Sequence, residues 1–492
     1  MRAKALRGAP TDGSPVGSLQ DVATRTGGRV RAGAPDLVLW GVATDTRAVL
    51  PGDLFCAIRG ERVDAHRLLG AAFAAGARAA LVDRPAGAGW SLGEVPAGCG
   101  VLEVPGVIPA LGRLAFSHLR GLEHPPLVVG ITGSVGKTGT RVWTAAALGG
   151  GGADVLTPHA SFNTEVTVPL VCLGAARQPF VVLELAMRGP GQIAYLSRIC
   201  RPTVGVLTVI GESHLAQLGS VEAIARAKGE LLEALPADGA AVLNADDPRQ
   251  EALVSRCPAR VLWYGLGGRS EVRAEGLTVG PRGAYAFVAV LPTGRRLPVR
   301  LCQPGRHQVS NALAALAVAH LVGVDAEAAA EGLGRADPEE HRLVWREAGP
   351  VHVLDDAYNA APHSVLAALA TLIEAAPPGR RAAVLGDMLE LGSATEAGHR
   401  RVGAAAAAAG LDWLVTVGPL AAIAAAEARA RGLDPRRVHA AADRDEARHL
   451  VLDLLAGAPD GLVLLVKGSR ALGLEEIVGA VLEWGRQAPC GN

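Results

Sequence analysis

The chain has 492 residues, of which 49% are hydrophobic, and its 48 Lys plus Arg balance its 48 Asp plus Glu. This length predicts about three domains, since domains usually span ~100 to 200 residues. Because a balanced charge lacks the positive field that nucleic acid or an anionic membrane selects, we expect no nucleic-acid partner. Any anionic ligand must then be bound by a local cluster of cations.

The N-terminus is basic but lacks the apolar stretch of a secretory signal. The apolar stretches at 311–324 and 404–409 are shorter than the ~20 residues of a membrane span. The 7 cysteines have no paired spacing, which fits a reducing compartment and indicates no zinc site. We therefore expect a cytoplasmic protein without membrane insertion.

Residues 1–124 form the first predicted domain. An apolar strand at 54–58, a helix at 67–75 and a strand at 79–83 indicate a small α/β domain. The break at His124-Pro125-Pro126 ends it, since consecutive prolines interrupt helix and sheet pairing.

Residues 125–336 form the second predicted domain. Strands alternate with helical stretches, which indicates a largely parallel sheet. A polar break at 335–340 follows its last helix. The expected strands are 127–131, 181–185, 204–209 and 241–243, and the expected helices include 221–235 and 311–322.

Residues 337–492 form the third predicted domain and alternate most plainly. The pattern is typical of a doubly wound, Rossmann-like sheet. The expected strands are 351–354, 382–385, 413–417 and 462–466, with helices between them such as 364–375.

A glycine-rich run follows the strand at 127–131 and precedes a helical stretch at 141–148. It reads Gly130-Ile131-Thr132-Gly133-Ser134-Val135-Gly136-Lys137-Thr138. In such a loop backbone N–H groups and the helix N-terminus attract phosphate, Lys137 adds charge, and the Thr138 hydroxyl can ligate magnesium. The spacing departs from the strict P-loop because Ile131 stands at the first glycine position. A glycine turn with an incidental lysine would not explain the flanking strand and helix. We predict that Thr132, Gly133, Ser134, Val135, Gly136, Lys137 and Thr138 bind ATP.

Three further residues follow strands of the same domain and are candidate metal ligands. Glu184 ends an apolar strand, His214 lies in the loop Gly211-Glu212-Ser213-His214, and Lys228 lies on the next helix. Taken singly, each has an ordinary interpretation as a solvated or hydrogen-bonded side chain. Their placement beside a phosphate loop favours a metal between nucleotide and substrate.

Further motifs make the chain similar to the Mur ligases over nearly its whole length, and most similar to the member that adds D-alanyl-D-alanine. In that family, segments like Asp45-Thr46-Arg47 belong to the domain that holds a uridine nucleotide. The other matching segments are Pro51-Gly52-Asp53-Leu54-Phe55, Glu184-Leu185-Ala186-Met187, Ala227-Lys228-Gly229-Glu230, Leu243-Asn244-Ala245-Asp246-Asp247, Asp356-Ala357-Tyr358-Asn359, Gly386-Asp387-Met388-Leu389-Glu390 and Lys467-Gly468-Ser469-Arg470.

The resemblance implies an α/β fold of three domains: a small N-terminal domain, a central P-loop ATPase domain and a C-terminal Rossmann-like domain. It implies a monomeric ATP-dependent amide ligase of peptidoglycan precursor synthesis, which releases ADP and phosphate. Its substrates would be a UDP-N-acetylmuramoyl tripeptide and D-alanyl-D-alanine, joined through an acyl phosphate.

Residue roles follow from the same resemblance. Lys137 and Thr138 would serve ATP and a first magnesium ion, with Glu184 also on metal. His214 would help hold a second magnesium ion, and Lys228 would be carbamylated to become an anionic ligand. Asn311, Arg342 and Asp356 would close on ATP from the far side of the cleft, and Thr46, Arg47, Asn163 and Asn359 would bind substrate.

Several positions depart from the family pattern. Gln308 and Val209 stand where the family usually has asparagine, and Gly139 is unusual in the helix after the phosphate loop. The further departures are the stretch 161–165, Thr167, Ala361 and Ala65. The lost amides remove hydrogen bonds that would orient a polar substrate, each worth ~1 kcal/mol or more.

Three alternatives remain open from the sequence. The first is a divergent Mur-family ligase for another carboxylate and amine; a folylpolyglutamate-type enzyme would lack the domain indicated by Asp45-Thr46-Arg47. The second is a P-loop kinase or mechanical ATPase, which does not predict Lys228. The third is a non-catalytic nucleotide-binding paralogue, against which the retention of Lys137, Glu184, His214 and Lys228 argues.

Overall fold

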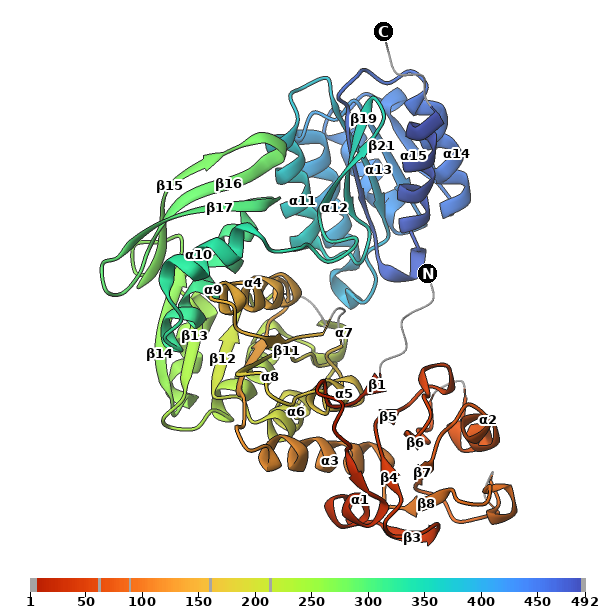
Figure 1. Ribbon diagram of the computed structural model, residues 1–492. Coiled ribbons are helices and arrows are strands. Elements are labelled where there is room, and N and C mark those ends of the chain that lie inside the picture. Colours follow the sequence, from red (N-terminus) through yellow and green to blue (C-terminus); the bar gives the residue numbers. More distant parts are fainter. Residues whose placement is uncertain (1–6, 61–62, 88–89, 159–161, 212–214, 488–492) are drawn as a thin grey trace.

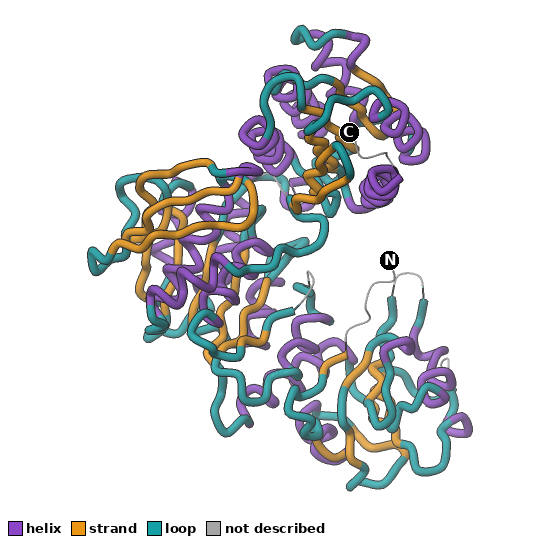
Figure 2. Tube along the Cα trace, turned by 45° about the horizontal axis from the view of Figure 1, so that its top comes forward, coloured by secondary structure: helices purple, strands orange, loops and turns teal. Residues whose placement is uncertain are grey.

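The computed structural model describes residues 7–60, 63–87, 90–158, 162–211 and 215–487. Its main sheets have six, nine and six strands and follow one another along the chain, from red to blue in Figure 1. Figure 2 shows these groups of strands, in orange, with helices around them. The fold class is therefore α/β, as expected. Within the described ranges no helix has the length and apolar character to cross a membrane.

The first sheet has the order β1-β5-β6-β7-β8-β3, and its inner strands β5 to β8 are parallel. The predicted helix at 67–75 begins as a 3-10 turn, Ala65–Leu68, before α2. The strands are β1 (Arg7–Gly8), β3 (Arg29–Ala32), β5 (Val42–Ala43), β6 (Leu54–Cys56), β7 (Ala79–Val82) and β8 (Gly100–Glu103), with β2 (Gly17–Ser18) and β4 (Val38–Leu39) as a separate pair. The helices are α1 (Leu19–Thr26), α2 (Leu69–Ala74) and α3 (Val107–Gly121).

The central sheet has the order β10-β11-β9-β12-β13-β14-β15-β16-β17. It is parallel as far as β15, and its inner strands β9, β11 and β12 are continuous apolar runs, as strands covered on both faces require. The strands are β9 (Leu127–Thr132), β10 (Val155–Leu156), β11 (Phe180–Glu184), β12 (Val204–Leu207), β13 (Ala240–Asn244), β14 (Arg260–Gly265), β15 (Val272–Val279), β16 (Ala284–Val290) and β17 (Arg296–Pro304).

The antiparallel edge formed by β15, β16 and β17 was not predicted from the sequence. Residues of β17 alternate between exposed and buried, which is typical of a strand with one solvated face. The sheet continues into this edge through the parallel pair β14 and β15.

Helices cover both faces of the central sheet. On one face α4 (Lys137–Gly149), α9 (His307–Leu321) and α10 (Ala326–Gly334) share an apolar core with β9 and β12. On the other face α5 (Thr167–Cys172), α6 (Gln192–Cys200) and α8 (Val221–Glu233) share a core with α3, so this core joins the first and central sheets. The short helix α7 (Leu215–Leu218) precedes α8.

The last sheet has the order β18-β19-β23-β20-β21-β22 and is parallel apart from its edge strand β18. Helices α11 to α13 pack on one face, and α14 and α15 pack on the other, which confirms the doubly wound prediction. The strands are β18 (Val344–Ala348), β19 (Val351–Asp356), β20 (Arg381–Gly386), β21 (Trp413–Val417), β22 (Val438–Ala441) and β23 (Val463–Lys467). The helices are α11 (Pro362–Ala375), α12 (Thr395–Ala408), α13 (Ala421–Ala430), α14 (Arg444–Leu455) and α15 (Glu475–Gln487).

Candidate active site

The glycine-rich loop joins β9 directly to α4. Gly133 and Gly136 have φ angles of 155° and 85°, which residues other than glycine rarely adopt. A Cβ atom on Gly133 would also lie 1.9 Å from the Thr208 hydroxyl oxygen. The Lys137 Nζ donates hydrogen bonds to the carbonyl oxygens of Gly133 (2.9 Å) and Ser134 (3.3 Å). The loop therefore has the strand–loop–helix geometry of a phosphate cradle.

Glu184 lies at the C-terminal end of β11, beside the start of α4. Its carboxylate accepts hydrogen bonds from Thr138 Oγ1 (2.7 Å) and Asn163 Nδ2 (2.8 Å), and its side chain is 2% exposed. Burial raises the pKa of Glu184, but Lys137, Arg342 and the two hydrogen bonds outweigh burial and hold the pKa below its usual value. Glu184 is thus a buried, ionised oxygen donor.

Lys228 reaches the same loop from α8. Its side chain is 1% exposed, and its Nζ donates a hydrogen bond to the Gly133 carbonyl oxygen at 2.8 Å. Burial and the neighbouring Lys137 hold the pKa of Lys228 well below its usual value, and Glu184 opposes them only in part. Lys228 is therefore a buried amine that loses its proton readily, unlike a solvated surface lysine.

The candidate metal ligands fit a magnesium ion that takes most of its ligands from phosphate and water and the rest from the protein. Thr138 and Glu184 offer hard oxygen atoms, and magnesium commonly takes one or two protein carboxylates beside phosphate and water. Among the residues that the structure describes, no group of three His, Cys, Asp or Glu side chains is arranged so that it could hold a metal ion. His214, the other predicted ligand, lies outside those residues.

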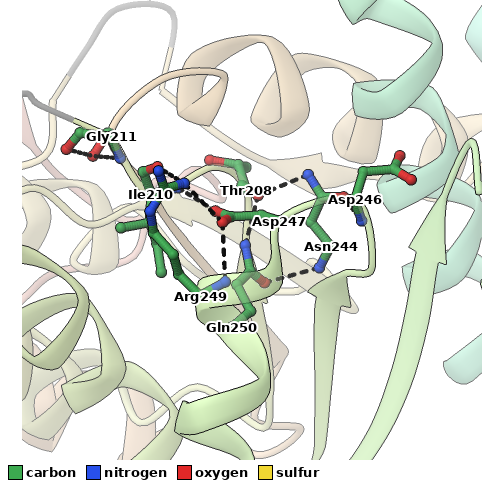
Figure 3. Close-up of polar contacts among 9 residues, drawn as sticks. Thr208, Ile210, Gly211, Asn244, Asp246, Asp247, Arg249 and Gln250 are labelled. Carbon is green, nitrogen blue, oxygen red and sulfur yellow. Dashed lines mark hydrogen bonds and ion pairs between the residues drawn. The ribbon is translucent and has the colours of Figure 1, made fainter. Parts of the chain in front are cut away.

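A segment that continues β12, residues 208–211, is held by side chains from the end of β13 and from the 3-10 helix that follows it, Pro248–Arg256 (Figure 3). The Thr208 carbonyl oxygen accepts hydrogen bonds from Asn244 Nδ2 (3.1 Å) and Gln250 Nε2 (2.9 Å). The backbone N–H of Ile210 donates to Asp247 Oδ2 at 2.8 Å. On the β13 side, side chains thus replace the backbone partners that β12 has as far as Leu207.

The same segment is hydrogen-bonded to the phosphate loop. Thr208 Oγ1 donates to the Val135 carbonyl oxygen (2.6 Å), and the Ser134 N–H donates to the Val209 carbonyl oxygen (2.6 Å). Ser134 Oγ also donates to the Gly211 carbonyl oxygen at 3.0 Å. The loop conformation therefore depends on the segment and on the side chains that fix it. The predictions from sequence assigned no role to Asn244, Asp247 or Gln250.

One cavity of about 1100 Å³ brings most of the predicted site residues together. The phosphate loop and Glu184 line one side, and the ends of β19 and β23 line the other. Predicted residues on this cavity are Ser134, Val135, Gly136, Lys137, Thr138, Asn163, Glu184, Asn311, Arg342, Asp356 and Asn359. Thr46 and Arg47 are not among its described lining residues; Arg47 is exposed and pairs with Asp45 in the first domain.

The far wall of the cavity also contains Lys467 and Tyr358, to which the sequence analysis assigned no role. Lys467 Nζ donates to Asp356 Oδ2 (2.6 Å) and to the Asn359 carbonyl oxygen (2.9 Å). The Arg342 guanidinium lies over the Tyr358 ring, with Cζ 4.0 Å from the centroid. In sequence, Asp356 and Lys467 each follow an apolar strand, but their pairing depends on β23 lying beside β19.

Two departures from the family pattern lie against each other between α4 and α9. Gln308 Oε1 accepts hydrogen bonds from Trp143 Nε1 (2.8 Å) and Asn311 Nδ2 (2.9 Å). A Cβ atom on Gly139 would lie 2.7 Å from Asn311 Nδ2. Gln308, which is longer than the asparagine usual in the family, thus holds the Asn311 side chain in the space that a side chain at position 139 would fill.

The fold and the cavity define a P-loop nucleotide-binding protein whose site lies between a parallel central sheet and a doubly wound sheet. Residues 131–319 match the Mur ligase middle domain, and residues 341–470 match the Mur ligase glutamate ligase domain. The chain is 35% identical, over 457 residues, to the UDP-N-acetylmuramoyl-tripeptide--D-alanyl-D-alanine ligase of Escherichia coli, covering 92% of this chain and 95% of that protein. The chain belongs to the Mur ligase family.

Solved structures agree with this assignment. A crystal structure of MurF from Acinetobacter baumannii matches with a TM-score of 0.84 and 29% identity over 96% of this chain and 99% of that one. MurF ligase from Thermotoga maritima, crystallised with ADP, matches with a TM-score of 0.77 and 26% identity over 91% of this chain and 98% of that one.

Proposed function

We propose that this protein joins D-alanyl-D-alanine to a UDP-N-acetylmuramoyl tripeptide at the cost of ATP, in cytoplasmic synthesis of peptidoglycan precursors. The observation that carries the proposal is the identity of 35% to the Escherichia coli ligase of that name, extended over 92% of this chain. The cavity supports it independently, because a phosphate loop and a buried carboxylate face it together.

Each predicted domain has a part in this proposal. Residues 1–124 hold the uridine nucleotide, with Thr46 and Arg47 as candidate contacts; residues 125–336 hold ATP; residues 337–492 close the cavity and present the second substrate. Asn163 and Asn359 line the cavity and are candidate substrate contacts. We expect the protein to act as a monomer.

The reaction forms an amide in two steps. The tripeptide carboxylate attacks the γ-phosphorus of ATP, which forms an acyl phosphate and releases ADP. The amine of D-alanyl-D-alanine then attacks the acyl carbon, and phosphate leaves. Lys137 and the N–H groups at the start of α4 offset negative charge as the phosphoryl group moves. A closed last domain keeps water from the acyl phosphate.

Magnesium fits the oxygen donors of Thr138 and Glu184, and when bound it would offset phosphate charge. A second magnesium ion, with His214 and a carbamylated Lys228 as ligands, belongs to the same proposal. The depressed pKa of Lys228 supports the carbamate, because a neutral amine can add to the carbon of CO2 and lose a proton. The product is an oxygen donor in place of a cation.

Phosphate release from ATP tests this function. With magnesium and the muramoyl tripeptide, we expect release that requires D-alanyl-D-alanine and yields an amide product by mass spectrometry. Lys228→Ala should lower the rate by at least about a hundredfold, as loss of a group that stabilises transition-state charge does. Removal of CO2 should lower the wild-type rate, and bicarbonate should restore it.

A matched control is Arg226→Ala, which removes an exposed cation from the same helix and should leave the rate unchanged. Release that ignores D-alanyl-D-alanine would contradict the proposed substrate and would favour a ligase for another carboxylate and amine. ADP binding without any release would favour a non-catalytic nucleotide-binding protein.

A further inference from the structure

The distribution of lysine separates a few cations from all the others. Lysine occurs only at Lys4, Lys137, Lys228 and Lys467, although Lys and Arg together number 48. Arginine therefore supplies almost every cation of the chain. The three lysines within the described residues all bond to the phosphate loop or to the loop that faces it. Lys137 and Lys228 already have proposed roles, whereas Lys467 has none.

Lys467 is the last residue of β23, a strand in the middle of its sheet. Its side chain is 3% exposed. The Nζ atom bonds the Asp356 side chain and the Asn359 carbonyl oxygen, and so connects both ends of the loop 356–359 after β19. The register of β19 and β23 pairs Asp356 with Lys467, and both residues line the far wall of the cavity.

The loop that Lys467 holds in turn contacts the segment that carries Arg342. The Tyr358 N–H donates to the His341 carbonyl oxygen at 3.1 Å, and the Tyr358 ring lies under the Arg342 guanidinium. Arg470, three residues after Lys467, approaches the same ring with Cζ 5.5 Å from its centroid. Two groups of the far wall, Asp356 and Arg342, thus depend on one loop.

An ammonium suits this position better than a guanidinium. Lysine has three N–H donors on one nitrogen, whereas arginine spreads five over a rigid planar fork. Two acceptors, at 2.6 and 2.9 Å, take two of the three N–H groups of the ammonium. A buried fork has five donors and would leave more of them without partners, which is costly. The geometry therefore explains why arginine does not stand at position 467 in a chain that uses it almost everywhere else.

We propose that Lys467 is a positioning residue that holds Asp356 and the loop 356–359 against the bound nucleotide. The inference rests on the proposed function only in that the cavity binds an adenine nucleotide; it does not depend on which peptide is ligated. Lys467 acts through Asp356 and need not touch the nucleotide itself.

Titration with ADP, without peptide substrates, tests the inference. Lys467→Met should weaken ADP binding at least about tenfold, the effect of losing a hydrogen bond between charged groups. Lys467→Arg should bind ADP about as weakly as Lys467→Met, because the guanidinium cannot replace the ammonium. When Asp356→Asn is already present, Lys467→Met should cause little further loss of ADP affinity. The double variant also removes both charges of the pair, so it avoids a buried unpaired carboxylate.

Arg381→Met is the matched control. Arg381 is the first residue of β20, at the end of the sheet away from Lys467, and its guanidinium donates to the carbonyl oxygens of Ala376 (2.8 Å) and Ala409 (2.9 Å). This variant should lower the melting temperature while leaving ADP affinity within about twofold, an effect below ~0.5 kcal/mol. If Lys467 had only a structural role, its variant would behave like the control, with a lower melting temperature and an unchanged ADP affinity.

The pH profile of ADP affinity gives a second measurement. Burial raises the pKa of Asp356 above its usual value and Asp355 adds to the rise, while Lys467 and Arg342 oppose it. Removing Lys467 should therefore move the acidic limb of the profile to higher pH. Unchanged ADP affinity in Lys467→Met, or full additivity with Asp356→Asn, would overturn the inference. A wild-type protein that binds ADP but ligates neither peptide would overturn the proposed function alone.

Discussion

His341 and Leu343, the residues on either side of Arg342, have left-handed backbone conformations, with φ of 62° and 55°. Such angles are uncommon for residues other than glycine and persist only where the surroundings stabilise them. Here the His341 ring lies 2.9 Å from the buried Asp355 carboxylate. The ion pair therefore helps to hold the segment that presents Arg342 to the cavity.

This pair predicts a pH-dependent stability. The hydrogen bond to Asp355 raises the pKa of His341 above its ordinary value of 6.5. A raised histidine pKa contributes stability that is complete below the unfolded pKa and is lost as pH rises through the folded one. His341→Asn, which tolerates the same φ, should therefore lower the melting temperature more at pH 6 than at pH 9. A difference in melting temperature that is constant across this range would contradict the ion pair.

At the scale of elements, α4 and α9 pack closely because Gly139 leaves room for Asn311. Gly139 lies in the first turn of α4, and a glycine inside a helix costs up to ~1 kcal/mol relative to alanine, so its presence needs a packing reason. Asn311 is held from both sides, by Thr140 Oγ1 at 3.1 Å and by Gln308 at 2.9 Å. Gly139 and Gln308 are thus two departures that fit one another.

The pair gives a prediction for a double variant. Gly139→Ala should displace Asn311 and weaken ADP binding about fivefold, near the ~1 kcal/mol of one hydrogen bond. Gln308→Asn shortens the side chain that holds Asn311, so the double variant should bind ADP more tightly than Gly139→Ala alone. Calorimetric titration of the single and double variants measures this coupling. Additive losses would mean that the two positions are independent.

Local sequence signals predicted the parallel strands and the phosphate loop, because apolar runs and glycine spacing are properties of neighbouring residues. They did not predict β15 to β17, where only one face is buried. Roles for Asp247 and Lys467 were also missed, since each depends on a partner from a distant strand. Asp356 and Lys467 are 111 positions apart in the chain. They meet only because β19 and β23 are neighbours, and that is a property of the whole sheet.

At the scale of the molecule, Glu339 links helix α4 of the central sheet to the segment that leads into the last sheet. Glu339 pairs with Arg141 of α4, a side chain that is 2% exposed, and lies 3.3 Å from Arg342 Nε. Burial lowers the pKa of Arg141 to about 10, so the side chain stays charged at neutral pH. The connection between α10 and β18 is thereby fixed to the helix that carries Lys137.

Glu339→Ala should loosen this connection. We expect a loss of about 2 kcal/mol of unfolding free energy, because a buried cation loses a partner, and a higher KM for ATP. Faster proteolysis within 335–343 would report the loosened link directly. Glu340→Ala removes an exposed neighbouring carboxylate and should change none of these values. Equal effects of the two variants would contradict a specific link.

The order of strands in the last sheet also has a consequence for synthesis of the chain on the ribosome. β23 lies between β19 and β20, although it is made after every other strand of that sheet. Until it emerges, β19 and β20 expose unpaired edges, which are templates for aggregation. The far wall of the nucleotide cavity, with Asp356 at its edge, is therefore assembled last. A nascent chain that stops short of β23 would carry a formed phosphate loop but no site that could close over it.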